Sequence, residues 1–231
     1  DLLELFTAKR VQSFRHIREE EVSKLVESLA SDAESGSVVD LSERLFSLLF
    51  NITSRVVFSR EGEGQHAFRV FLTKLSNAAS GFSIADLYPS VKLLNSMSCL
   101  RRKLEKMVKE SDRILDPIID EHFSKKKQGR PEEDLVDVLL KFHKDTLQDD
   151  TNSSFSLTTE NIKAIILEIF GAGSETCYAT TEWAMLELLK CPEAMDRAQV
   201  EGRKVFQAKG AVDEESLNHL KFLKLVVKET L

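Results

Sequence analysis

The stretch Thr158–Lys190, TTENIKAIILEIFGAGSETCYATTEWAMLELLK, predicts one long central helix around which the rest of the chain is organised. Thr158 can cap its first turn, where the helix dipole favours the acidic Glu160, and Pro192 cannot continue it. At 1.5 Å per residue such a helix is roughly 48 Å long, enough to cross a whole domain. Its first half is apolar on nearly every side, which predicts that it is buried.

The middle of this helix departs from the apolar pattern. Gly171 and Gly173 each cost about 1 kcal/mol relative to alanine in a helix interior, which suggests that something approaches the backbone closely. The polar residues Ser174, Glu175 and Thr176 follow directly. Small residues followed by an acid and a hydroxyl suit a helix against which a flat cofactor lies and past which protons must travel.

Two segments carry a resemblance to a known family. Ala172-Gly173-Ser174-Glu175-Thr176 resembles the central-helix signature of the cytochrome P-450 haem-thiolate monooxygenases, small–Gly–x–acid–Thr. Residues 220–231, LKFLKLVVKETL, resemble the family's next marked helix, which carries Glu-x-x-Arg. The intervening Cys-Pro-Glu break and the loop with Gly210 occur in the family's order. The resemblance covers essentially the whole chain and is closest to plant members.

The composition is compatible with this family. Of the 231 residues, 9 are glycine and 4 are proline, and few helix breakers with long periodic runs favour an all-α fold. A net charge of −6 argues against a nucleic-acid-binding protein. The three cysteines show neither a disulfide framework nor zinc spacing, and Cys177 and Cys191 are expected to be inert packing residues. The five histidines show no metal-binding spacing and are expected at the surface.

The resemblance implies a partial cytochrome P-450 fold, truncated at both ends, with residues 1–231 forming an incomplete catalytic domain. The family's hydrophobic N-terminal anchor is not in this sequence, and no transmembrane run is evident. The family's haem-ligand loop, Phe-x-x-Gly-x-Arg-x-Cys-x-Gly, matches none of the three cysteines. We therefore expect no metal ligand in this chain, with the axial cysteine and the arginine partner of Glu229 lying beyond Leu231, and we expect the fragment alone to be inactive and to hold no haem stably.

The resemblance also implies roles for the central motif. Thr176 and Glu175 would be catalytic: the Thr176 hydroxyl would lie beside the oxygen-binding face of the haem, and Glu175 would relay protons with a pKa raised by partial burial. Ala172, Gly173 and Thr176 would contact the haem, iron protoporphyrin IX. The alternatives are a Thr176 hydroxyl that only bonds back to the carbonyl of Ala172, a solvated Glu175, and helix–helix close packing at Ala172 and Gly173.

Substrate contacts are expected from two places. In the family the helix ahead of the motif borders the substrate pocket, which implies such a role for Ile165, Ile166, Ile169 and Phe170. The apolar loop at 82–85 resembles a substrate-access region, with Phe82 and Ile84 as contacts. The alternatives are ordinary core packing for the helix and a packed or membrane-facing loop for 82–85.

By resemblance, the parent protein would insert one oxygen atom from dioxygen into a small hydrophobic molecule, such as a plant terpenoid or another specialised metabolite. It would receive electrons from NADPH through the NADPH-cytochrome P-450 reductase, at the cytosolic face of the endoplasmic reticulum membrane. A rival hypothesis of another class is a non-catalytic helical scaffold or interaction protein, in which the AGSET stretch is only a tight packing point.

Apolar periodicity and capping residues predict the other helices. Residues 1–9 are expected to end an earlier helix, and a turn is expected at Ser35-Gly36-Ser37. The remaining helices are expected at 11–34, 40–58 with Asp40 as cap, 66–79, 100–126, 134–144, 192–209, 213–217 and 220–231.

Overall fold

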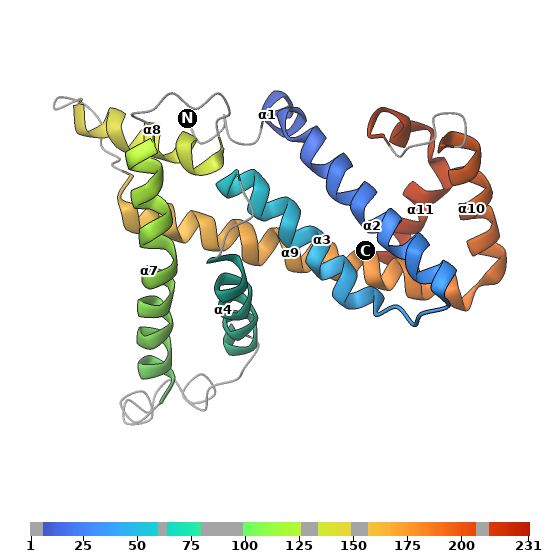
Figure 1. Ribbon diagram of the computed structural model, residues 1–231, viewed down its shortest axis with the longest axis horizontal. Coiled ribbons are helices and arrows are strands. Elements are labelled where there is room, and N and C mark those ends of the chain that lie inside the picture. The colour runs from blue at the N-terminus through green and yellow to red at the C-terminus, as the bar shows by residue number, and fades with distance from the viewer. Residues whose placement is uncertain (1–6, 60–63, 80–98, 126–133, 149–156, 207–212) are drawn as a thin grey trace. The chain divides into compact units, whose positions relative to one another are not determined.

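The structure is a computed structural model that describes residues 7–59, 64–79, 99–125, 134–148, 157–206 and 213–231 (Figure 1). Every regular element in these ranges is a helix, which confirms the predicted all-α fold. The helices are α1 (Ala8–Ser13), α2 (Arg15–Ser35), α3 (Leu41–Phe58), α4 (Gly64–Ala79), α7 (Cys99–Lys125), α8 (Leu135–Gln148), α9 (Thr159–Lys190), α10 (Pro192–Phe206), the 3₁₀ helix η3 (Glu215–His219) and α11 (Lys221–Thr230).

The chain divides into two compact units. The first unit consists of residues 1–56 and 172–231, and the second consists of residues 57–171. The central helix α9 contributes residues to both, and the amide of Asn161 donates to the Thr158 hydroxyl at 3.3 Å, so the predicted cap of α9 is confirmed.

The second unit has an aromatic core. In it α4 packs against α7, and α7 packs against α8. Four phenylalanines form the centre: the ring of Phe170 on α9 meets that of Phe68 edge-on at 4.7 Å and stacks on that of Phe58 at 5.6 Å, and Phe71 stacks on Phe68 at 6.4 Å. Ile162 and Ile166 of α9 are also completely buried, but Ala164 is exposed and Ile165, Leu167 and Ile169 are half-buried. The prediction that the first half of this helix is buried on nearly every side was therefore wrong for the described structure, in which only the face with Ile162, Ile166 and Phe170 is buried.

A lysine ties α9 to α7 within the second unit. The ammonium of Lys163 lies 2.7 Å from the carboxylate of Asp112 and 2.8 Å from that of Asp116, which are one turn apart on α7. Only 12% of the Lys163 side chain is exposed. The charge that interrupts the apolar run of α9 is therefore paired rather than buried alone.

The sequence pattern predicted neither the start of α1 at Ala8 nor the break between α1 and α2 at Phe14. Thr7 is extended and its hydroxyl accepts from the amide of Arg10, so α1 begins at Ala8 and does not continue an earlier helix. The predicted helix 11–34 is interrupted at Phe14, where Ser13 donates to the carbonyl of Arg10 at 2.7 Å. Side chains that bond local carbonyls compete with the helix ladder there.

The turn after α2 agrees with expectation. Gly36 ends α2 in the left-handed conformation with φ of 68°, which a glycine adopts without a steric penalty. The side chain of Asp40 then accepts from the amide of Glu43 at 3.0 Å, so the predicted cap of α3 is confirmed.

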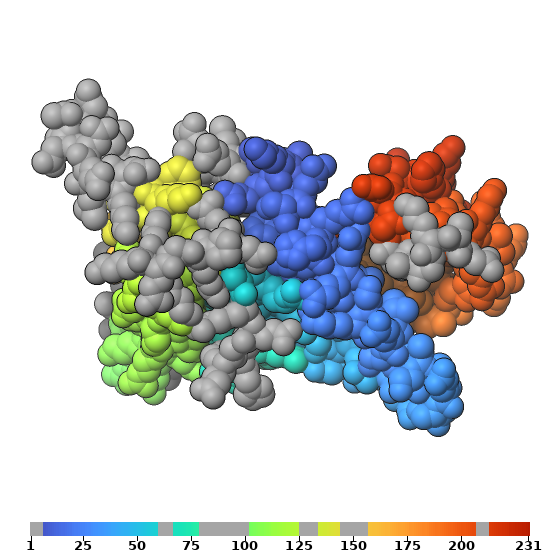
Figure 2. All heavy atoms as spheres, turned by 45° about the horizontal axis from the view of Figure 1, so that its top comes forward, coloured from blue at the N-terminus to red at the C-terminus, as the bar shows by residue number. Residues whose placement is uncertain are grey.

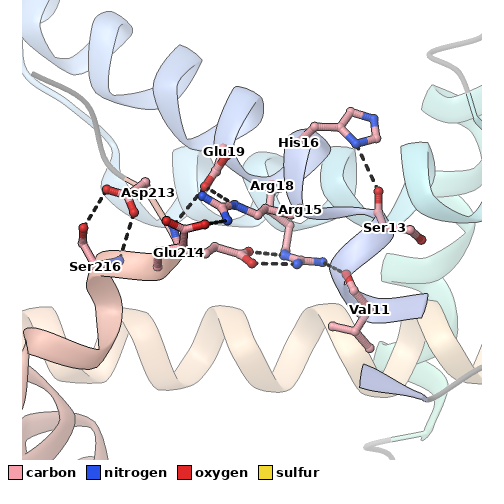
Figure 3. Close-up of polar contacts among 10 residues, drawn as sticks. Val11, Ser13, Arg15, His16, Arg18, Glu19, Asp213, Glu214 and Ser216 are labelled. Atoms are coloured by element: carbon pink, nitrogen blue, oxygen red, sulfur yellow. Dashed lines mark hydrogen bonds and ion pairs between the residues drawn. The ribbon is translucent and has the colours of Figure 1, made fainter. Parts of the chain in front are cut away.

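A polar network joins α2 to the segment at η3 (Figure 3). The guanidinium of Arg18 binds both carboxylate oxygens of Glu214, and Arg15 contacts Glu215 at 2.8 Å. The carboxylate of Glu19 accepts from the backbone amide of Glu214 at 2.9 Å. The pKa of Glu214 lies below its usual value, mainly because its carboxylate accepts hydrogen bonds from Arg18. This carboxylate is therefore charged at neutral pH.

The beginning of α11 is capped by another helix. Leu220 precedes α11 and offers no side-chain hydrogen bond, but the carboxylate of Glu201 on α10 accepts from the amides of Phe222 at 2.9 Å and Leu223 at 3.0 Å. The backbone hydrogen bond from Phe222 is the main reason that the pKa of Glu201 lies below its usual value. A neighbouring helix thus satisfies amide donors that would otherwise lack partners.

Several apolar side chains of the first unit remain at the surface. Trp183 on α9 is 56% exposed, and α1 has no buried residue. In Figure 2 the side chains of α1 and α2, in blue, form part of the face that is presented. Within the part of the chain that the structure describes, none of the helices has the length and apolar character needed to cross a membrane.

Candidate functional site

The motif 172–176 lies in the middle of α9, and its five residues differ sharply in exposure. Ser174 is 5% exposed, whereas Ala172, Gly173, Glu175 and Thr176 are exposed. Successive helical residues are rotated by about 100°, so Ala172 and Thr176 project to the side of the helix opposite Ser174. The motif therefore has one anchored residue and an open face made by its neighbours.

The helix surface has free space at both glycines of the motif region. A Cβ atom added at Gly173 or at Gly171 would have no described atom within 4 Å, apart from the adjoining residues and the backbone of α9 itself. The alternative that Gly173 is small because another helix packs closely against it therefore has no support among the described residues. A small, exposed face that retains room for a side chain fits the edge or plane of a flat group.

The Thr176 hydroxyl makes the hydrogen bond that the alternative interpretation describes. Its Oγ1 donates to the carbonyl of Ala172 at 2.6 Å. This bond uses the single hydroxyl proton, and the oxygen can still accept a hydrogen bond from a ligand or a water molecule on the exposed side. The observed bond thus fits both interpretations of Thr176.

Glu175 is exposed, so the expected partial burial of this carboxylate was wrong for the described structure. Its position directly before Thr176, about 100° around the helix, places it beside the open face rather than under it. A carboxylate in contact with water is suited to collect protons from solvent.

The apolar residues ahead of the motif fall into two pairs. Ile166 and Phe170 are 0% and 1% exposed and belong to the core of the second unit, which is the alternative role considered for them. Ile165 and Ile169, four residues apart, are only half-buried. Phe82 and Ile84 lie outside the described residues.

Ser174 is held by a hydroxyl of α3. Its Oγ lies 3.1 Å from Oγ1 of Thr53, and Thr53 donates its own proton to the carbonyl of Leu49 at 2.9 Å. Because each hydroxyl has a single proton, Ser174 must be the donor in the pair. This contact could not be predicted from the sequence, since two hydroxyl residues 121 positions apart create no periodic pattern.

Two further contacts of the first unit follow the same line along α3 and α9. The rings of Phe46 and Tyr178 meet edge-on at 5.9 Å, and Ser42 donates to the carboxylate of Glu182. The residue numbers rise on α9 as they fall on α3, so the two helices run antiparallel here. The Ser42 hydrogen bond is the main reason that the pKa of Glu182 lies below its usual value.

A buried ion pair in the second unit was not predicted. His122 is 3% exposed and Asp134 is 0% exposed, so the expectation that every histidine lies at the surface was wrong. Nδ1 of His122 lies 2.7 Å from the carbonyl of Ile118, and Nε2 lies 2.8 Å from the Asp134 carboxylate. Both partners are acceptors, so both ring nitrogens donate and the ring is an imidazolium.

The electrostatics agree with this assignment. Burial alone would lower the pKa of His122, but the hydrogen bond and charge of Asp134 outweigh it and the pKa is raised. His122, Asp134 and the half-buried Asp137 also form a group that could hold a metal ion. Both nitrogens of His122 already have oxygen partners, so the contacts favour an ion pair over a metal site.

Two other features lie apart from the motif. Cys177 and Cys191 are both exposed, so the expectation that they are packing residues was wrong. An open hollow of about 880 Å³ in the first unit includes none of the motif residues. It is lined mainly by α10, with residues of η3 and α11, and its lining residues are Asp196, Arg197, Val200, Glu201, Lys204, Val205, Ser216, His219 and Phe222.

Comparison with known proteins gives a consistent family match. The family model described as "Cytochrome P450" matches residues 2–231. Cytochrome P450 71D10 of Glycine max is 44% identical over 99% of this chain. Melianol synthase CYP71BQ4 of Citrus sinensis is 42% identical over 99%, and desmethyl-deoxy-podophyllotoxin synthase of Sinopodophyllum hexandrum is 43% identical over 100%. The chain covers 44%, 45% and 45% of these relatives, respectively, which is less than half of their length.

Solved structures show the same fold. A zebra fish cytochrome P450 structure with progesterone matches with a TM-score of 0.73 and 23% identity, over 94% of this chain and 48% of that chain. A second one, with abiraterone, matches with a TM-score of 0.73 and 24% identity, over 98% of this chain and 49% of that chain. At this identity the likeness concerns the fold alone.

Proposed function

Since this chain belongs to the cytochrome P450 family, we propose that the whole protein is a haem-dependent monooxygenase that inserts one oxygen atom from dioxygen into a small hydrophobic molecule. The plant relatives named melianol synthase and desmethyl-deoxy-podophyllotoxin synthase support a plant specialised metabolite, such as a terpenoid, as the substrate class. The observation that carries the proposal is the family match across 2–231 together with the exposed small–Gly–x–acid–Thr face in the middle of α9.

The residues of the motif suit a haem. Ala172 and Gly173 are small and exposed, and a Cβ atom added at Gly173 would have no described atom within 4 Å beyond α9's own backbone and the adjoining residues, so a planar group could contact the helix there. Haem with a thiolate ligand supplies the activation of dioxygen. In our proposal Ala172, Gly173 and Thr176 hold and orient this group, and the axial cysteine belongs to a part of the protein outside this chain.

Thr176 and Glu175 are proposed to deliver protons from solvent to the site of the cofactor. The Thr176 hydroxyl, fixed by its bond to the Ala172 carbonyl, presents its oxygen on the exposed side of α9. The exposed carboxylate of Glu175 can exchange protons with solvent and pass them toward that hydroxyl. These two residues are the proposed catalytic residues of this chain.

The half-buried isoleucines are the better candidates for contact with a substrate. Ile165 and Ile169 retain exposed area that an apolar molecule could cover. Ile166 and Phe170 are already enclosed by protein, so in our proposal they pack beneath the residues that contact the substrate. Phe82 and Ile84 remain proposed contacts on the resemblance of their loop to an access region.

The remaining proposals concern the protein's surroundings. We propose that electrons come from NADPH through a separate reductase, and that the whole protein is anchored at the cytosolic face of the endoplasmic reticulum membrane. Residues 1–231 alone are proposed to be inactive, because no cysteine among them has the haem-ligand context.

The reduced carbon monoxide difference spectrum of the full-length protein tests the proposed function. A thiolate-type band is the expected result, because it reports the haem and its cysteine ligand together. A folded full-length protein without any haem absorption would overturn the proposal and favour a non-catalytic helical scaffold. If the thiolate-type band is present, spin-state shifts on adding apolar ligands separate substrates from non-binding molecules.

A further inference from the structure

We propose that the partly buried hydroxyl pair of Thr53 and Ser174 sets the rotation of α9 about its own axis, and that Thr53 is thereby a positioning residue for the proposed haem-facing side of the motif. This inference rests on the proposed function, because it concerns how Gly173 and Thr176 are presented to a cofactor. It assigns a role to the variable position of the small–Gly–x–acid–Thr pattern, which Ser174 occupies.

The pair has a defined direction. Ser174 is 5% exposed, and its Oγ lies 3.1 Å from Thr53 Oγ1. Thr53 uses its proton for the carbonyl of Leu49, so its oxygen is left as an acceptor and only Ser174 can donate. A hydrogen bond with fixed donor and acceptor depends strongly on angle, unlike apolar contact.

The direction matters because of helix geometry. Turning α9 by one residue rotates every side chain by about 100° and would carry Gly173 or Glu175 into the place that Ser174 now occupies. Neither could reproduce the contact: glycine has no hydroxyl, and a carboxylate would be buried opposite a threonine oxygen that has no proton to donate. The Thr53–Ser174 pair therefore favours the one rotation that leaves Ala172 and Thr176 on the open face.

Two more contacts of α3 would act with the pair. Phe46 with Tyr178 and Ser42 with Glu182 lie one and two turns further along α9, on the side of the helix that bears Ser174. These contacts fix the alignment of the two helices, but they are farther from the motif. The hydroxyl pair is a contact that α3 makes within the motif itself.

Two variants at position 53 distinguish the hydroxyl from the side-chain shape. Thr53→Val keeps the branched shape and removes the hydroxyl, and Thr53→Ser keeps the hydroxyl and removes the methyl group. In the full-length haem-loaded protein we expect Thr53→Val to lower the ratio of product formed to NADPH oxidised by about 3- to 10-fold, with Thr53→Ser close to wild type. Haem transfer to an acceptor apoprotein should be faster for Thr53→Val, which gives a readout independent of turnover.

Epistasis tests whether Thr53 acts through the motif. In a Thr176→Ala background, Thr53→Val should lower the product-to-NADPH ratio no further. Ser174→Ala should reproduce the effect of Thr53→Val, and the double variant should be no worse than either single one. Thr73→Val is the matched control, because Thr73 Oγ1 also donates to a carbonyl four residues earlier, at 3.1 Å, but on α4.

The outcomes separate the two proposals. If the wild-type full-length protein holds no haem, the proposed function fails. If it holds haem but Thr53→Val matches wild type in both readouts, or Thr53→Ser is as impaired as Thr53→Val, the positioning role is wrong. Should Thr53→Val not fold, Ser174→Ala decides by the same readouts, and an unchanged product ratio and haem-transfer rate would overturn the inference.

Discussion

Thr176 and Thr181 make the same kind of hydrogen bond at two points of α9. Each hydroxyl donates to the carbonyl four residues earlier, Thr176 to Ala172 at 2.6 Å and Thr181 to Cys177 at 2.8 Å. Both residues are exposed. If Thr176 served only the helix, the two positions would respond alike to loss of the hydroxyl, so Thr181 is a natural comparison.

We predict that Thr176→Ala and Thr181→Ala differ in catalysis but not in stability. In the haem-loaded full-length protein, Thr176→Ala should lower the ratio of product to NADPH oxidised on the order of 10-fold, because proton delivery beside the cofactor loses its positioned hydroxyl. Thr181→Ala should leave this ratio unchanged, and both variants should unfold at similar temperatures. Equal ratios for the two variants would show that the proposed role of Thr176 is wrong.

The ion pair of His122 and Asp134 gives a prediction about pH. Asp134→Asn removes the charge, while asparagine still caps α8, where the Asp134 side chain now accepts from the amide of Asp137 at 2.8 Å. The unpaired, buried His122 should then lower the free energy of unfolding by about 3 kcal/mol at pH 6. Chemical unfolding of the full-length protein at several pH values provides the measurement.

The sign of the pH dependence follows from the raised pKa of His122. The contribution of the ion pair is complete below about pH 6.5, the ordinary pKa of histidine in an unfolded chain, and is lost as pH rises through the raised pKa of the folded state. The stability difference between wild type and Asp134→Asn should therefore shrink at alkaline pH. A difference that stays constant with pH would contradict a charged His122.

At the scale of residues, motif-like positions could be predicted and isolated polar contacts could not. The order of small, acidic and hydroxyl residues at 172–176 marked the candidate site, and the roles of these residues stay a prediction. Burial of His122 could not be predicted, because its partner Asp134 lies twelve positions later and a single histidine has no periodicity. The burial of Ser174 depends likewise on a hydroxyl 121 positions away.

At the scale of elements, α11 depends on α10 for its first turn. Glu201→Ala removes the carboxylate that accepts from Phe222 and Leu223, and we predict a loss of about 1 kcal/mol in the free energy of unfolding, as for other helix caps. Hydrogen exchange at these two amides should become faster. Gln199→Ala is the control, since Gln199 is exposed on the same helix and its side chain accepts from Arg203.

The pKa of Glu201 adds a pH dependence to this cap. Because that pKa is lowered in the folded state, the contribution of Glu201 is present above the ordinary value of 4.5 and is lost as pH falls through the lowered value. Exchange protection of Phe222 should thus decline in acid for wild type and be low throughout for Glu201→Ala. Protection unchanged by the substitution would mean that α11 begins without the help of Glu201.

The helices themselves were largely predictable, and their ends followed capping residues. Asp40 and Thr158 cap the helices that were expected from them. The break at Phe14 was missed because apolar periodicity continues through it, while the interruption arises from polar side chains. Ser13 bonds the carbonyl of Arg10, and Arg18 reaches the carbonyl of Val11 at 2.9 Å.

At the scale of the whole molecule, the Arg18–Glu214 contact joins positions 196 residues apart within the first unit. We predict that Arg18→Lys lowers the free energy of unfolding by about 1 kcal/mol, because lysine keeps the charge but cannot bind both carboxylate oxygens. Arg44→Lys is the matched control, because the Arg44 guanidinium donates to the Asp32 carboxylate at 2.9 Å from a more exposed side chain.

A double-mutant cycle completes this test. Arg18→Lys combined with Glu214→Gln should cost less than the sum of the two single changes, since both remove the same interaction. Thermal unfolding of the full-length protein gives the required values. Strict additivity would mean that the paired geometry in Figure 3 contributes nothing to stability.

Long-range pairings limited what the sequence could predict at this scale. The all-α class and the central helix follow from local patterns between Thr158 and Lys190. No local pattern links α2 to the segment at Glu214, or α3 to Ser174, because these partners are far apart in the sequence and come together only when the chain folds. The candidate site was therefore predicted as a motif, and its support by α3 had to be seen in the structure.

The single tryptophan of this chain makes its two units optically distinguishable. Trp183 is 56% exposed in the first unit, so its fluorescence reports the solvent around the second half of α9. The phenylalanine cluster of the second unit contributes little emission at those wavelengths, whereas far-ultraviolet circular dichroism follows the helices of both units. Coincident melting curves from the two methods would identify one cooperative transition, and separated curves would assign a melting temperature to each unit.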